Sequence, residues 1–259
     1  ALQGTPATPD MQQVMFDSLL EVDEPRRMIC STPTFLGTVR RVISPQGLYA
    51  IAGEKMAALA NLFPDAEVEF FMALKNPATL IPFIAAQDNS PPYHELMSGI
   101  DPEALRWAPT MRRILSALPG HRIVVWCHED TPLIWPEVVR RIATMPSDVP
   151  LKAGLQILGD IMRPEGIQMI REALAREERL TVASRRRIFT DTTEVIGSTP
   201  ATSTSFSCST NPRMELSSLV MRSASSSVTL ILARRATRRT VAVSTDIESS
   251  SITIGCIRV

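Results

Sequence analysis

The sequence predicts an α/β fold in which a short parallel sheet is flanked by helices. Two apolar runs, residues 68–74 and 121–127, have the composition of buried strands, and amphipathic helical segments lie before and after them. Helices that alternate with short apolar strands are typical of a parallel sheet covered on both faces. A chain of 259 residues with 44% hydrophobic content is also long enough to bury a core of this kind.

The expected elements follow in order along the chain. Residues 11–20 have helical spacing, residues 27–30 form a short strand, and residues 48–63 make the clearest helix of the front half, which leads into the central strand at 68–74. Helices are expected after that strand at residues 77–86, 101–118 with an interruption at Pro109, 135–145 with its start at Trp135, and 164–180.

A basic turn connects the central strand to the helix that follows it. Asn76 is of a type that caps helices, Pro77 suits the first helical position, and Pro82 is expected to kink or restart the helix. Lys75 is therefore predicted at the carboxyl end of a strand beside the free N–H groups of a helix. Open α/β sheets bind anionic ligands there, because the helix dipole and unpaired amides favour negative charge. The alternative is a solvated lysine in an ordinary turn.

Composition limits the classes of partner and compartment. The formal net charge is zero, so nothing global indicates nucleic acid or an anionic membrane. No apolar run reaches the roughly 18 to 20 residues of a membrane span, and no signal segment opens the chain. The start at Ala1 is interpreted as truncated. The chain has four cysteines, which lie far apart without a CxxC pair: Cys30, Cys127, Cys208 and Cys256. This spacing predicts neither a zinc site nor a disulfide framework, and it favours a cytoplasmic setting.

The composition changes near Asp191, which places an expected domain boundary between residues 1–190 and 191–259. From residue 192 to 259, 26 of 68 residues are Ser or Thr, and most of this segment has neither helical nor strand periodicity. Three interpretations compete: a disordered tail, a small β-rich appendage with strands at 228–233 and 252–257, or a segment read in a shifted frame. We favour the shifted frame, because the change is abrupt and begins inside a helical pattern.

Two segments resemble landmarks of the sulfotransferase family. The first is FFMALKNP at residues 70–77, which is similar to an apolar strand that ends in Arg-Asp-Pro or Arg-Asn-Pro, with Lys75 at the arginine position. The second is CHEDTPLIWPEVVRRI at residues 127–142, which is similar to a strand that ends in Tyr-Glu-Asp-Leu before a loop, a proline and a helix. His128 takes the tyrosine position, and the resemblance covers residues 27–180.

The resemblance implies a P-loop NTPase-like core, incomplete in this chain. It also implies 3′-phosphoadenosine 5′-phosphosulfate as co-substrate, no metal, and transfer of a sulfuryl group to a hydroxyl or amine of an unknown small-molecule or glycan acceptor. The resemblance assigns Lys75 and Asn76 to the nucleotide site, where Lys75 would hold the 3′-phosphate. Lysine would do so as a point charge, without the bidentate hydrogen bonds of the arginine usual at this position. The family usually has a serine eight residues further on, at the position of Phe83.

Two nucleotide-binding segments of the family are missing from the sequence. No Lys-containing, Gly/Ser/Thr-rich phosphate loop follows an early strand, since Gly53 lies within a helical pattern and Gly4 has no lysine beside it. The late Gly-rich segment is also absent. We therefore expect a sulfotransferase-like protein that is incomplete at its N-terminus and inactive as it stands. The alternative is a non-catalytic α/β interaction domain.

Other chemistry can be weighed at His128, Glu129 and Asp130. A metal site would need further ligands, but His121 opens the strand that ends before His128, so about seven residues of extended chain hold the two histidines roughly 20 Å apart. Cys127 and His128 are neighbours that point to opposite faces, which disfavours a nucleophilic pair. We expect capping or ion-pairing roles for Glu129 and Asp130, and no catalytic residue is assigned.

Overall fold

A computed structural model describes residues 6–19, 27–32, 34–147, 149, 151, 154–176, 181–193, 228–233 and 253–256. The described residues form two compact units. The first contains the described residues up to Glu129 together with two short strands from the C-terminal segment, and the second contains those from Asp130 to Thr193. Most of the segment 191–259 lies outside the described residues, so its expected disorder or shifted frame stays a prediction.

The first unit is built on a five-stranded mixed sheet. Its strands lie in the order β5-β4-β6-β1-β7, with these bounds: β1 Arg27–Thr32, β4 Glu67–Leu74, β5 Arg122–Cys127, β6 Val228–Ala233 and β7 Thr253–Cys256. β4 and β5 are parallel, as the sequence predicts. The other pairings are antiparallel, because β6 runs against both β4 and β1, and β7 runs against β1. The fold is thus mixed α/β with a parallel pair.

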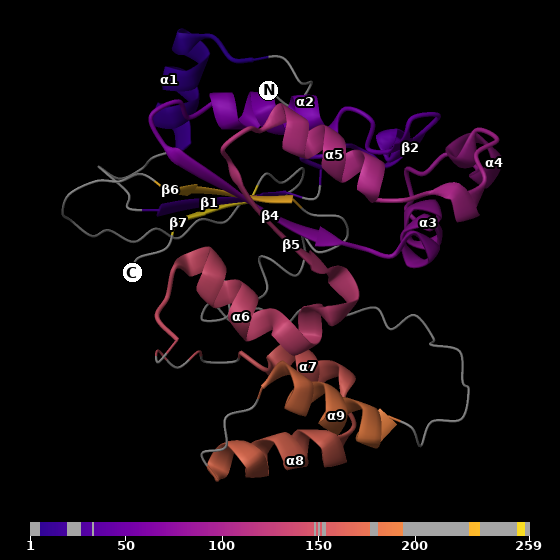
Figure 1. The fold of residues 1–259 in the computed structure, drawn as a ribbon, viewed down its shortest axis with the longest axis vertical. Coiled ribbons are helices and arrows are strands. Elements are labelled where there is room, and N and C mark those ends of the chain that lie inside the picture. The colour runs from indigo at the N-terminus through magenta and orange to yellow at the C-terminus, as the bar shows by residue number, and fades with distance from the viewer. Residues whose placement is uncertain are drawn as a thin grey trace. The chain divides into compact units, whose positions relative to one another are not determined.

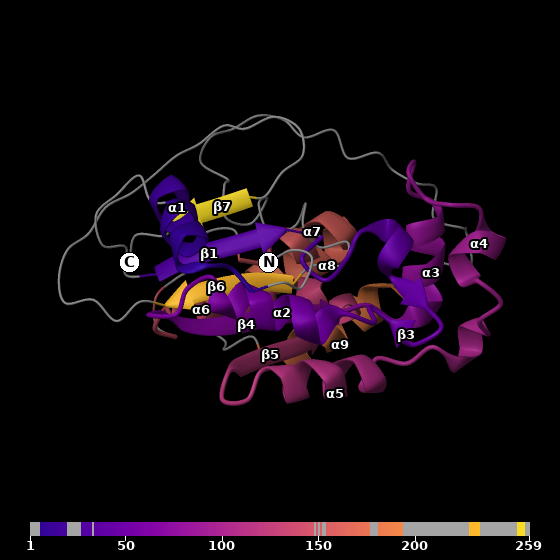
Figure 2. The same ribbon diagram turned by 90° about the horizontal axis from the view of Figure 1, so that it is seen from above.

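Two helices of the first unit cover the sheet, α2 (Ala52–Asn61) and α5 (Ala108–Ala117). They lie side by side in both views (Figures 1 and 2). The helices approach closely at Gly53, where a Cβ atom would lie 2.7 Å from the Arg113 carbonyl oxygen. The other elements of this unit are α1 Pro9–Leu19, η1 Val39–Arg41, β2 Ile43–Ser44, β3 Gly47–Leu48, α3 Pro77–Ala85, α4 Tyr93–Met97 and η2 Pro102–Ala104. A further 3-10 turn, η3, spans His128–Asp130.

The central strand β4 is buried on both faces, as its apolar sequence predicts. Val68, Phe70 and Met72 share one core cluster with residues of α2 and α5. Since successive side chains of a strand point to opposite faces, Glu69 and Phe71 point away from that cluster. Both are nonetheless buried, at 7% and 1% exposure.

Glu69 is a buried acid of the sheet, and its carboxylate pairs with two arginines. Its Oε2 accepts from Arg27 of β1, and its Oε1 accepts from Arg122 of β5 at 3.0 Å. The side chains of Arg27 and Glu69 are each 10% exposed, whereas that of Arg122 is 53% exposed. Two donors on one carboxylate offset the cost of taking its charge out of water.

β5 differs from the buried strand that the run HRIVVWC predicts. It stands at one edge of the described sheet, its residues are exposed or half-buried, and Val125 is 45% exposed. Pro109 also differs from expectation. It lies in the first turn of α5 rather than interrupting a longer helix, because its missing N–H is harmless there.

The second unit is helical and contains α6 Thr131–Ala143, α7 Gln156–Ile161, α8 Pro164–Ala175 and α9 Val182–Thr193. Its core cluster is apolar and consists of Leu133, Leu158, Met162, Ile170 and Ile188. The helix expected to start at Trp135 begins earlier, because Pro132 supplies the proline of the first turn, and Pro136 lies inside α6. Arg185, 2% exposed, pairs with Glu137.

Among the described residues, no helix is both long enough and apolar enough to pass through a bilayer.

Candidate anion-binding site

Lys75 lies where the sequence places it, directly after β4 and before α3. The last paired residues of the parallel strands are Leu74 and Cys127, so the chain continues into Lys75 and Asn76 on one strand and into His128 and Glu129 on the other. The two landmark segments of the sequence therefore meet at the carboxyl ends of the parallel pair. Glu129 Oε1 accepts hydrogen bonds from Asn76 N at 2.8 Å and from Thr79 Oγ1 at 3.0 Å.

Asn76 caps α3 as predicted, and its Oδ1 accepts from the N–H of Ala78 at 3.0 Å. The N–H groups of Thr79 and Leu80 are also taken, because both donate to the Asn76 carbonyl, at 2.9 and 2.8 Å. Pro77 has no N–H, and the N–H of Asn76 donates to Glu129. The expectation of unpaired amides at this helix start is therefore wrong, since Asn76 and Glu129 together satisfy them.

The Lys75 ammonium lies over an aromatic ring. Its Nζ is 4.0 Å from the centroid of Phe83, which is the position where the resemblance would place a phosphate-binding serine. No carboxylate of the described residues lies within 4 Å of this nitrogen, although the charge of Glu129 is near enough to act on it. Burial lowers the pKa of Lys75 below its ordinary value, and Glu129 partly opposes that shift.

The backbone at Lys75 is fixed by an indole that sequence reasoning missed. Trp107 Nε1 donates to the Lys75 carbonyl at 2.7 Å, and the Trp107 ring stacks on Tyr49 with centroids 5.6 Å apart. Tyr49 has a positive φ of 45°, which is uncommon for a residue with a side chain. An aromatic pair thus holds the turn that presents Lys75.

The pKa values of His128 and Glu129 are both shifted by burial and by neighbouring groups of this site. Burial lowers the pKa of His128, the Lys75 charge lowers it further, and Glu129 opposes both. Burial alone would raise the pKa of Glu129, but hydrogen bonds from the backbone amides of Asn76 and Glu129 and from the Thr79 hydroxyl, together with His128, hold it below its ordinary value. Glu129 is therefore a carboxylate at neutral pH, whereas His128 is neutral.

Asp130 has a separate role in the second unit, where it pairs with Arg186 at 2.6 Å. The hydrogen bonds of Glu129 and this ion pair agree with the structural roles expected for both acids. Within the described part of the chain, no group of three or more His, Cys, Asp or Glu side chains could hold a metal ion. Neither Cys30 nor Cys127 forms a disulfide within the described part of the chain.

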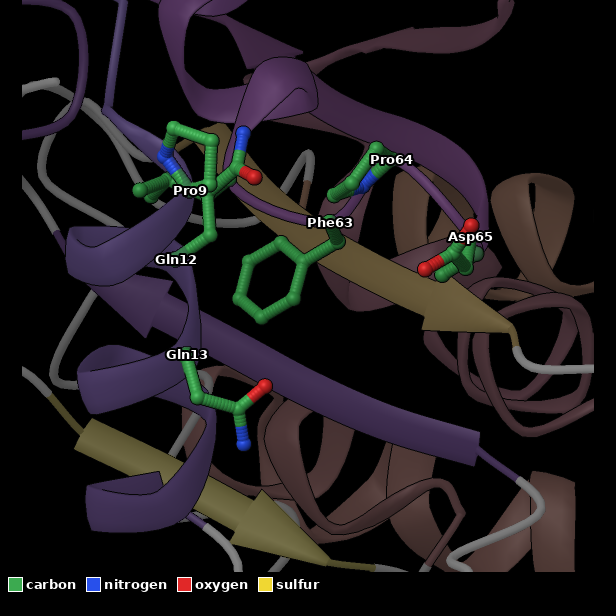
Figure 3. A pocket seen from close by; sticks show the side chains of 8 residues that line it. Pro9, Gln12, Gln13, Phe63, Pro64 and Asp65 are labelled. Atoms are coloured by element: carbon green, nitrogen blue, oxygen red, sulfur yellow. The ribbon is translucent and has the colours of Figure 1, made fainter.

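A pocket of about 290 Å³ lies at the opposite end of β4 (Figure 3). It is lined by α1 and by the turn between α2 and β4: Pro9, Gln12, Gln13, Leu62, Phe63, Pro64, Asp65 and Ala66. The eight residues of β4 separate this pocket from Lys75, a span of roughly 25 Å for an extended chain. The pocket therefore does not belong to the candidate anion site.

Comparisons with protein-family models, with curated proteins and with solved structures give no match to this chain.

Proposed function

We propose that this chain is a sulfotransferase-like protein whose Lys75 and Asn76 bind the 3′-phosphate of 3′-phosphoadenosine 5′-phosphosulfate or of its product, adenosine 3′,5′-bisphosphate. The class transfers a sulfuryl group to a hydroxyl or amine acceptor. The role proposed for this chain as it stands is nucleotide binding, and no described residue is assigned as catalytic base.

One observation carries the proposal: Lys75 and Glu129, from the two segments that resemble sulfotransferase landmarks, lie together at the carboxyl ends of β4 and β5. This edge of a parallel pair is where α/β folds bind ligands. Two donors remain available there, because neither Lys75 Nζ nor Asn76 Nδ2 has a hydrogen bond or ion pair within the described chain. An ammonium and an amide are suitable partners for a phosphate.

The site also carries features that oppose tight binding. Phe83 covers one side of the Lys75 ammonium, and Glu129 places negative charge beside it. We therefore expect micromolar rather than nanomolar affinity, and the affinity should fall with added salt because the contact is electrostatic.

Isothermal titration calorimetry with adenosine 3′,5′-bisphosphate tests the proposal. Loss of the Lys75 ammonium in Lys75→Ala should weaken binding by about 1.5 to 3 kcal/mol, or roughly 10- to 150-fold. Arg112→Ala is the matched control, because Arg112 is an exposed cation on α5 and should leave the affinity unchanged.

Adenosine 5′-monophosphate, which lacks the 3′-phosphate, should bind more weakly than the bisphosphate and should be insensitive to Lys75→Ala. Equal affinity of the wild-type protein and Lys75→Ala for the bisphosphate would remove Lys75 from the site. No binding by the folded wild-type protein would reject nucleotide binding and favour the non-catalytic interaction domain.

A further inference from the structure

Glu129 occupies donors that an anionic ligand at the start of α3 would use. Its Oε1 takes both the Asn76 N–H, at 2.8 Å, and the Thr79 hydroxyl, at 3.0 Å. The remaining backbone donors of this helix start are engaged within α3 by the side chain and the carbonyl of Asn76. A phosphate could therefore reach a backbone N–H here only if one of these internal partners left.

Glu129 is the partner more easily displaced. Asn76 Oδ1 and the Asn76 carbonyl belong to the cap and the first turn, so their release would unravel α3. Glu129 is an exposed side chain that reaches α3 from η3, and its departure would break its two hydrogen bonds while the internal hydrogen bonds of α3 need no partner from it. Its carboxylate resembles a phosphate in being an anion that accepts from an N–H and a hydroxyl together.

We propose that Glu129 is an internal competitor for the anion site, so that a bound phosphate must displace the Glu129 carboxylate from Asn76 and Thr79. This inference rests on the proposed function, because it concerns the ligand of the same site. A phosphate oxygen on the Asn76 N–H would need the place that Glu129 Oε1 holds, and two anions so close repel each other. Lys75 Nζ and Asn76 Nδ2 would contact the ligand first, and the two other donors would follow once Glu129 leaves.

The test compares Glu129→Gln with the wild-type protein in the calorimetric titration with adenosine 3′,5′-bisphosphate. Glutamine keeps the length and one acceptor oxygen but removes the charge, so the ligand should bind at least about tenfold more tightly. Glu67→Gln is the control. Glu67 is an exposed glutamate at the other end of β4, and its replacement should leave the affinity unchanged.

The outcomes separate this inference from the proposed function. Tighter binding by Glu129→Gln, with unchanged binding by Glu67→Gln, supports both the proposed function and the competing role of Glu129. If the wild-type protein binds and Glu129→Gln binds equally or more weakly, Glu129 does not compete with the ligand, and the proposed nucleotide site is retained. No binding by either protein overturns the proposed function and the competitor with it. If Glu129→Gln does not fold, Glu129→Ala, which removes the whole carboxylate, carries the same expectation.

Discussion

Replacement of Gly53 by alanine tests the close approach of α2 and α5 that closes the core of the first unit. The added Cβ would lie 2.7 Å from the carbonyl oxygen of Arg113 and 3.1 Å from the Ala117 Cβ. Even a weak C–H···O contact needs about 3.3 Å, so the helices must separate by about 0.6 Å. The blocking atom is backbone and cannot rotate away.

Two effects of opposite sign compete in Gly53→Ala. Alanine in place of glycine in a helix is worth up to about 1 kcal/mol, whereas overpacking of a buried contact costs about 1 to 3 kcal/mol. Because the obstructing atom is a carbonyl, we expect the overpacking to dominate and the free energy of unfolding to fall by about 1 to 2 kcal/mol.

Gly159→Ala is the matched control, because no described atom outside the neighbouring residues and the backbone of α7 lies within 4 Å of the Cβ added at Gly159. This variant should gain up to about 1 kcal/mol. Urea unfolding followed by hydrogen exchange in peptides of α2 and α7 measures each unit separately. A gain in stability for Gly53→Ala equal to that for Gly159→Ala would show that α2 and α5 do not approach as closely as described.

Two further predictions concern buried and titrating charges. Glu69→Gln removes the carboxylate that pairs with two arginines, so the free energy of unfolding measured in urea should fall by about 3 to 5 kcal/mol. The control Glu67→Gln changes an exposed position and should alter the free energy of unfolding by less than about 0.5 kcal/mol. Equal effects of the two variants would mean that Glu69 is not buried. The pKa of His128 is lowered by burial and by Lys75 against the opposing effect of Glu129, so the unfolded chain binds the proton more readily and stability falls as the pH drops below about 6.5. His128→Gln should reduce this loss between about pH 7.5 and 5, and an unchanged pH profile would contradict it.

Local features of the candidate site could be predicted from the sequence. The Asn76 cap and the helix start at Pro77 follow from residue type and position alone, and the structure confirms both. The place of Lys75 at the end of β4 follows from the apolar run before it. Sulfuryl transfer and nucleotide binding stay predictions, because they depend on a ligand.

Features that depend on strand order could not be predicted. The run HRIVVWC has the composition of an inner strand, yet β5 is an edge strand of the described sheet, and composition does not reveal which neighbours a strand receives. The hydrogen bond between Asn76 and Glu129 follows from the register in which Leu74 pairs with Cys127. The signal for it was present, since both segments directly follow apolar strands, but the register is set by tertiary packing.

The two arginines on Glu69 make the alignment of the central strands specific. A shift of β4 by one residue against β5 would move Glu69 from Arg122 to the opposite face, among the hydrocarbon side chains of the cluster around Phe70. The misaligned sheet would then contain a buried carboxylate that has lost its ion pairs with Arg27 and Arg122. Apolar strands such as FFMAL and IVVW could slide past one another at little cost. Glu69 thus penalises such misfolded alignments, and it does so far from the site where the chain is proposed to bind its ligand.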